Sequence, residues 1–277
     1  MAFNFDDLSI HYLKNIDSDA QEPHEQISEE YFNKVIDIIV DNQYGGNKVN
    51  EIDNSFIMDY SFAGNTNIDE ITLIDTSAIG TGAFEFCENL ITVNTNKDNL
   101  PLILSHSSFA NCTNLKEIQF ICSNAPIRCF YNCQNIRQII LNTESNIKEI
   151  NDECFCNCTE LRNVNLNIDS IKYIGIRAFY SCLSLRNITL SNQLETIDTL
   201  AFANCSLTTI TIPKSVKYIE TKAFYNNATL QNVIFEHTNE DEIYLNDDIF
   251  GNCPNVIISG HNNKIMEYAK ANKLKIR

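Results

Sequence analysis

The chain has 277 residues, of which 44% are hydrophobic and 20% are charged, and its formal net charge is −16. This composition can supply a continuous apolar core and argues against general disorder. An acidic surface repels nucleic acid and anionic lipid, so we expect neither as a partner. No run approaches the ~18 apolar residues of a membrane span. The N-terminus lacks a basic region followed by an apolar stretch, so we expect no classical signal peptide.

Acidic residues concentrate at the N-terminal end. Residues 1–60 hold 13 acids against three bases, a net charge of −10, whereas the remaining 217 residues carry −6. We assign residues 1–48 to an acidic segment with a capping helix, which begins at Ser28 and continues to Asn42 because apolar residues recur there at helical spacing. We expect this helix to cover the apolar end of the repeats that follow, and docking to a partner is the alternative.

A phenylalanine recurs through the middle of the chain at intervals of 21 to 26 residues. An aliphatic residue usually stands five positions before each phenylalanine and a small residue directly before it, and a cysteine or asparagine follows three positions later. A period in the low twenties with a fixed apolar pattern predicts a solenoid, in which each repeat buries its apolar face against its neighbours. The phenylalanines are Phe62, Phe84, Phe109, Phe130, Phe155, Phe179, Phe202, Phe224 and Phe250.

Each repeat continues with a segment of the form Leu-x-x-Ile-x-Leu. In one of them Ile118 and Phe120 alternate with Glu117 and Gln119, which is the period of a strand with one buried face. Stacked strands of successive repeats would form a parallel sheet, and the segment from phenylalanine to cysteine would return the chain as a short helical turn. We therefore predict an α/β solenoid of about nine repeats over residues 49–260.

The period ends after Pro254, and residues 261–277 read as a second capping helix. Ile265, Met266 and Ala269 supply its apolar face. Basic residues gather toward its C-terminal end, where the helix dipole favours positive charge.

Most of the 11 cysteines follow the repeat instead of forming a framework of their own. Cysteine and asparagine share one column because each can hydrogen-bond buried turn backbone, cysteine weakly and asparagine fully. This usage favours reduced thiols in a cytosol-like compartment, although stacked cysteines could form disulfides if the protein were exported.

A zinc site is a second interpretation of the cysteines. Cys154, Cys156 and Cys158 alternate along the chain, and Cys122, Cys129 and Cys133 fall one or two repeats away. The repeat already explains four of these six residues, and no histidine has paired ligand spacing. We therefore expect no metal and no cofactor.

These columns resemble those of the BspA-like (Treponema pallidum type) leucine-rich repeats. The stretch Ile210-Thr211-Ile212-Pro213-Lys214-Ser215-Val216-Lys217-Tyr218-Ile219-Glu220-Thr221-Lys222-Ala223-Phe224 follows the pattern of that family closely, with Asn227 in its cysteine column. The resemblance covers about Asn50 to Gly260. It implies a leucine-rich-repeat solenoid, read here as right-handed with a parallel concave sheet, that serves as a binding scaffold. Relatives are often surface antigens or adhesins.

The outward strand positions are the first candidate binding surface. Amides and hydroxyls, which both donate and accept hydrogen bonds, dominate them. Such a surface could bind an extended peptide or a glycan, but Thr and Asn ladders also satisfy each other in stacked strands. The candidate residues are Glu117, Gln119, Gln138, Asn163, Asn165, Asn187, Thr189, Thr209, Thr211 and Asn232.

Four basic residues stand one position earlier in four consecutive repeats, and we name them the basic stripe: Lys116, Arg137, Arg162 and Arg186. Strand stacking would place them about 5 Å apart. Like charges at that spacing repel unless an anion lies nearby, either on an acidic partner or among the protein's own acids, such as Glu160.

No phosphate loop, nucleophile elbow or metal-binding helix is present, so we expect no enzyme activity. The sequence predicts a non-enzymatic, cytoplasmic protein-interaction scaffold that binds a protein or peptide through its concave face. An acidic partner is the case that the basic stripe leaves open. The alternative is a surface antigen or adhesin that is exported without a recognisable signal.

Overall fold

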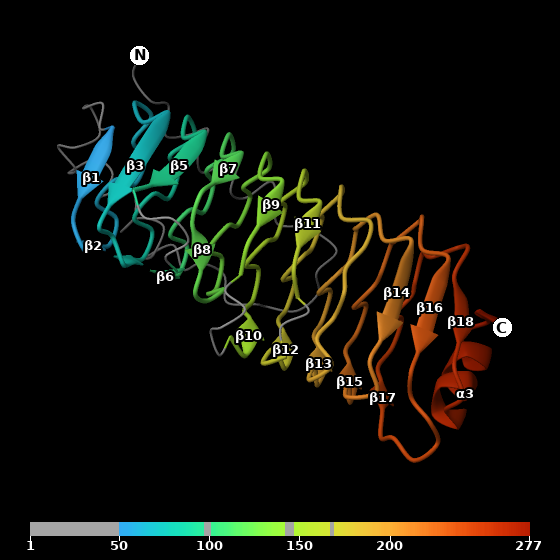
Figure 1. Ribbon diagram of the computed structural model, residues 1–277. Coiled ribbons are helices and arrows are strands. Elements are labelled where there is room, and N and C mark those ends of the chain that lie inside the picture. Colours follow the sequence, from blue (N-terminus) through green and yellow to red (C-terminus); the bar gives the residue numbers. More distant parts are fainter. Residues whose placement is uncertain (1–49, 97–100, 142–146, 167–168) are drawn as a thin grey trace, which may run out of the picture. The chain divides into compact units, whose positions relative to one another are not determined.

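The computed structural model describes residues 50–96, 101–141, 147–166 and 169–277. The predicted helix between Ser28 and Asn42 lies outside these residues, as does the rest of the acidic segment. Within the described ranges the repeats form a parallel-stranded leucine-rich-repeat solenoid of about nine turns with very little helix, which confirms the predicted fold class (Figure 1). The boundaries at residues 48 and 260 stay a prediction.

The strands form two rows that follow the sequence order (Figure 1). All of their pairings are parallel, and the first row comprises three sheets, β1-β3-β5-β7, β9-β11 and β14-β16-β18-β19. The first-row strands are β1 Glu51–Asp53, β3 Glu70–Ile74, β5 Thr92–Thr95, β7 Glu117–Ile118, β9 Gln138–Ile139, β11 Asn163–Val164, β14 Thr209–Ile212, β16 Asn232–Phe235, β18 Ile257–Ser259 and β19 Lys275–Ile276.

The second row lies just before each phenylalanine and comprises two sheets, β2-β4-β6-β8 and β10-β12-β13-β15-β17. Its strands are short because the chain turns directly afterwards. They are β2 Phe56–Ile57, β4 Ala78–Ile79, β6 Pro101–Leu104, β8 Ile121–Cys122, β10 Glu149–Ile150, β12 Tyr173–Ile174, β13 Thr196–Ile197, β15 Tyr218–Ile219 and β17 Tyr244–Leu245.

The nine phenylalanines stand in single file through the core. Neighbouring rings from Phe62 to Phe250 are stacked with centroids 5.2–5.7 Å apart and planes within 20° of parallel. Each ring therefore buries its faces against the repeats on either side, and a single Phe→Ala change would cost about 3–5 kcal/mol. The ring spacing also gives the rise of the solenoid per repeat at the phenylalanine column.

The cysteine column has the role that its chemistry predicts. Seven thiols donate to the backbone carbonyl oxygen of the phenylalanine in the preceding repeat, with S···O distances of 3.0–3.2 Å. Asn227 makes the same bond from Nδ2 to the oxygen of Phe202 at 2.8 Å. Cysteine and asparagine share the column because both donate to this buried carbonyl oxygen, which in most repeats also accepts from the backbone N–H group three residues later.

The segment around each phenylalanine is not the short helical turn that the pattern suggests. The second residue before and the second residue after each phenylalanine have positive φ, for example Arg128 (55°) and Asn132 (58°) around Phe130. This alternation turns backbone N–H groups toward the next repeat, and Phe130 N donates to Cys154 O at 2.9 Å. Six of the nine later positions are asparagine, which tolerates positive φ.

The only helix in the described ranges is α3, Asn263–Ala271. The side chain of Asn262 caps it by accepting from the N–H groups of Lys264 and Ile265. The helix is shorter than the segment 261–277 suggests, because Lys273 takes a positive φ of 56° and the chain then adds β19 to the first row.

Candidate interaction surface

The first row of strands presents the predicted binding residues to solvent. In β14, Ile210 and Ile212 point into the core while Thr209 and Thr211 point outward. All fourteen predicted site residues lie at the surface. Twelve are exposed, and Thr209 and Asn232 are half-buried. The period-two assignment of outward positions therefore places each of these side chains where a partner can reach it.

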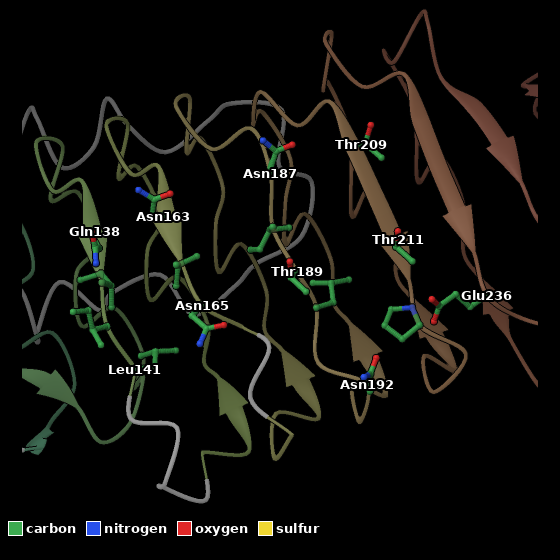
Figure 2. Close-up of a pocket in the computed structure, with 16 residues that line it drawn as sticks. Gln138, Leu141, Asn163, Asn165, Asn187, Thr189, Asn192, Thr209, Thr211 and Glu236 are labelled. Carbon is green, nitrogen blue, oxygen red and sulfur yellow. The ribbon is translucent and has the colours of Figure 1, made fainter.

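A groove of about 790 Å³ lies on this face (Figure 2). It spans the repeats from β9 to β14, and we refer to it as the amide groove. It brings together seven of the predicted site residues, whereas the other seven lie outside its lining. The seven are Gln138, Asn163, Asn165, Asn187, Thr189, Thr209 and Thr211.

The amide groove is almost uncharged and mixed in polarity. Its lining has eight amide or hydroxyl residues, seven apolar residues, among them Ile140, which is 47% exposed, and a single charged residue, Glu236. No aromatic side chain is among the lining residues. Asn192, Pro213 and Glu236 were not predicted, because they follow the strands and fall outside the repeating outward columns. Their position directly after a strand end is the signal that could have pointed to them.

The first row is open where the groove lies. Between β11 and β14 the extended segment 187–190 joins no sheet, and none of the backbone hydrogen bonds among the described residues uses its N–H groups. The second row stays paired from β12 through β13 to β15 at the same level. Phe179 and Phe202 also remain stacked at 5.2 Å. The opening is therefore confined to the face that carries the groove.

The basic stripe borders the amide groove. Arg137, Arg162 and Arg186 directly precede the groove residues Gln138, Asn163 and Asn187 in sequence. Backbone bonds join this part of the repeats, since Arg162 N donates to Arg137 O at 3.0 Å and Thr208 N donates to Arg186 O at 3.0 Å.

Within the described chain, one ion pair involves the basic stripe. Arg162 lies 3.0 Å from Glu160, and both side chains are well exposed, at 59% and 41%. Self-neutralisation is therefore partial. Glu117 and Glu160 are the only acids within two sequence positions of the four cations, which leaves a local excess of two positive charges.

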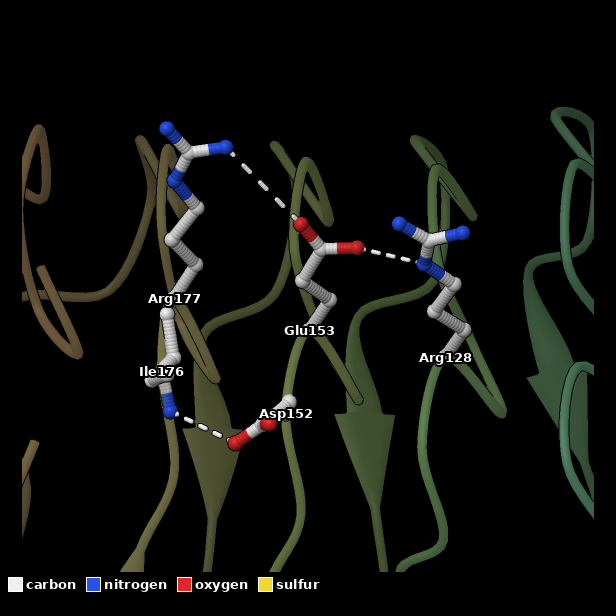
Figure 3. A network of polar contacts seen from close by, with 5 residues as sticks. All are labelled: Arg128, Asp152, Glu153, Ile176 and Arg177. Atoms are coloured by element: carbon white, nitrogen blue, oxygen red, sulfur yellow. Dashed lines mark hydrogen bonds and ion pairs between the residues drawn. The ribbon is translucent and has the colours of Figure 1, made fainter. Parts of the chain in front are cut away.

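A second polar cluster lies on the turn segments, where its charged groups pair with one another (Figure 3), although Arg177 Nε is buried without a hydrogen bond among the described residues. Glu153 stands between Arg128 and Arg177 and pairs with both. Each arginine also lies over the tyrosine three residues later, 5.5 Å and 5.6 Å from the ring centroid. The carboxylate, both cations and both rings hold one another, so this cluster stabilises the stack of turns.

The cysteines do not form a reactive or metal-binding centre. All eleven are buried and unbridged. Burial raises the pKa of the thiols, to about 12 for Cys87, Cys129 and Cys205. No group of three or more His, Cys, Asp or Glu side chains in the described ranges could hold a metal ion. Cys122 and Cys156, which the repeat did not explain, are core residues with 0% and 4% exposure.

A comparison with protein families identifies the repeats. The model described as BspA type leucine rich repeat region (6 copies) matches residues 38–162 and 148–277. The chain belongs to the BspA-type leucine-rich-repeat family. This confirms the resemblance seen in the columns, and the match reaches past the described repeats to residue 38 on one side and through α3 on the other.

A comparison with solved structures supports the solenoid fold. A leucine-rich repeat protein from Bacteroides ovatus is 18% identical, with a TM-score of 0.56 over 77% of this chain and 63% of its own. The chain thus spans less than two thirds of that relative. A leucine rich cell surface protein from Faecalibacterium prausnitzii (18% identity, 74% and 76% coverage, TM-score 0.41) and the leucine-rich repeat protein of T. pallidum (18%, 80% and 78%, 0.37) also match. No curated protein matches the chain.

In the part of the BspA-type solenoid that the structure describes, no helix has the length and apolar character that crossing a bilayer requires.

Proposed function

We propose that this BspA-type protein is a non-enzymatic scaffold that binds a polypeptide partner through the amide groove and the outward face around it. The observation that carries the proposal is the groove itself, which gathers seven outward amide and hydroxyl residues beside an open stretch of the first row. Solenoids commonly bind along the surface that stacking leaves exposed.

The lining favours a polypeptide over a glycan. Side-chain amides donate and accept at once, so they match the alternating N–H and C=O groups of a peptide backbone. The exposed side chain of Ile140 adds an apolar contact. A sugar ring gains from an aromatic face in its site, and the lining of this groove contains none.

The basic stripe supports an acidic partner. Its excess of positive charge contrasts with the net charge of −16 of the whole chain. Complementary charge at the rim of an interface mainly raises the association rate and fixes orientation, and its effect weakens with salt. Reduced, buried thiols agree with a cytosol-like compartment, which we include in the proposal.

The test is to fill the groove without disturbing the core. Asn165→Tyr combined with Thr211→Tyr places two bulky side chains at exposed groove positions. The matched control is Thr196→Tyr on the second row, where the same column already holds Tyr173 and Tyr218 in neighbouring strands. Affinity capture from native lysate should recover a partner with the wild type and the control but not with the groove variant. Equal recovery with all three proteins would refute the proposal.

A further inference from the structure

The four cations of the basic stripe repeat with the rise of the solenoid. Lys116, Arg137, Arg162 and Arg186 belong to the repeats of Phe109, Phe130, Phe155 and Phe179, whose rings are separated by 5.6, 5.7 and 5.2 Å. Adjacent strands of a sheet lie about 4.8 Å apart, slightly closer than these rings, so the stripe advances by about 5 Å per cation and extends over about 15 Å. A partner that engages all four cations must present its acids with that period.

An α-helix has this period. Its pitch is about 5.4 Å, so acids placed once per turn stay in step with the four cations to within about 1 Å. An extended segment repeats on one side about every 6.7 Å, and over three intervals it runs ahead of the stripe by about 5 Å. The spacing of the stripe thus discriminates between the two backbone conformations of an acidic partner.

The cations are available for such a partner. The exposed pair between Arg162 and Glu160 is of a kind worth about 0–1 kcal/mol, so a partner carboxylate can replace Glu160 at little cost. Three of the four cations are arginines, whose guanidinium groups bind carboxylates through two parallel hydrogen bonds.

We infer that the basic stripe binds an α-helix that carries one acidic side chain per turn and lies along the direction in which the repeats stack. The inference rests on the proposed function, since it names the shape and charge of the polypeptide that the scaffold holds. The flank of this helix faces the amide groove, because the groove residues Gln138, Asn163 and Asn187 directly follow the stripe.

The experiment compares two synthetic peptides by fluorescence anisotropy with the full chain. One is an alanine-based helix of about 16 residues with one glutamate per turn. The other carries the same number of glutamates, placed at every second residue with β-branched residues between them, which favours an extended form. The helical peptide should bind at least about ten-fold more tightly. Equal affinity, tighter binding of the extended peptide, or no binding of either would overturn the inference.

Matched variants identify the site. Arg137→Gln combined with Arg186→Gln should weaken binding of the helical peptide by roughly ten-fold. Lys148→Gln combined with Lys214→Gln removes the same charge from exposed positions off the stripe and should leave binding unchanged. An equal loss in both variants would mean non-specific attraction and refute the site. A lysate partner that is lost on filling the groove but indifferent to the stripe variants would refute this inference and leave the proposed function standing.

Discussion

Glu85 offers the sharpest test of how the repeats pack, because it is a carboxyl group inside the solenoid. It directly follows Phe84, is 2% exposed, and its Oε2 atom makes no hydrogen bond within the described part of the chain. The same column holds Ala63 and Ala110 in the adjacent repeats. Burial raises the pKa of the Glu85 carboxyl from 4.5 to about 8, although the positive charge of Arg128 opposes this.

The size and sign of the effect follow from linkage. The folded protein binds the Glu85 proton more tightly than the unfolded chain does. The resulting contribution to the free energy of unfolding is fully present below pH 4.5 and is lost as the pH rises through about 8. Each pKa unit corresponds to about 1.4 kcal/mol, so the loss at pH 7 is about 3 kcal/mol and above the folded pKa reaches about 5 kcal/mol. Glu85→Gln cannot ionise and avoids this loss.

The assay is urea unfolding followed by circular dichroism between about pH 5 and pH 9. The free energy of unfolding of Glu85→Gln minus that of the wild type should grow by about 3–5 kcal/mol across this range, whatever constant offset the amide brings. Glu117→Gln, which removes an exposed carboxylate, should give a nearly flat difference. A flat difference for Glu85→Gln as well would refute the claim that this carboxyl is buried and protonated in the folded state.

Four further predictions concern the repeat. An alanine Cβ at Gly175 would collide with the side chain and the backbone N of Asp152, so Gly175→Ala should cost about 2 kcal/mol in urea unfolding. The Oδ1 atom of Asp152 accepts from the N–H group of Ile176 (Figure 3). Adding Asp152→Ala removes the side-chain part of the collision and should recover part of the loss; if it recovers none, the side chain of Asp152 is not the cause. Asn227→Ala should lower the free energy of unfolding by about 2 kcal/mol, and Asn227→Cys should lower it by less than half of that. Equal losses would contradict a shared role of cysteine and asparagine at this position. The native protein should resist thiol reagents, and the denatured protein should titrate as eleven thiols. Backbone amide hydrogens should exchange faster at residues 187–190 than at residues 210–212.

The inward-facing half of the fold could be predicted from the sequence because one repeated environment dictates each of its columns. A phenylalanine ring such as Phe179 meets another ring on both sides, so the same residue is required at that position in every repeat. The thiol or amide three positions later always meets the same carbonyl group. Periodicity reports such columns directly.

The turn conformation was harder to predict because its determinant is φ and not hydrophobicity. Arg128, Glu153 and Leu200 all adopt positive φ at the same column, although their side chains have nothing in common. Stacking hydrogen bonds between repeats impose this conformation and override local preference. Only the asparagines of the later column gave a signal, and the pattern does not separate such a turn from a helical one.

The groove could be predicted only in part for a different reason. Its outward amides are visible as columns, but its position depends on where the first row opens, and segment 187–190 keeps the apolar pattern of a paired strand, with Leu190 4% exposed. The pattern of inward apolar residues does not indicate where strand pairing is lost. Glu236 lines the groove at that opening, so the inward pattern could not predict its position there either.

A solenoid separates the residues that make the fold from those that can make an interface. Contacts with neighbouring repeats determine which residues occupy the inward positions, but they do not determine the outward ones. A surface feature that continues over several repeats therefore needs another cause. The basic stripe occupies four consecutive repeats, and the amide groove overlaps the last three of these at the level where the first row opens. Stacking demands neither like charges about 5 Å apart, which repel, nor an unpaired strand. Their coincidence between Arg137 and Arg186 is the feature for which we propose a bound partner, and the stripe variants test that proposal directly.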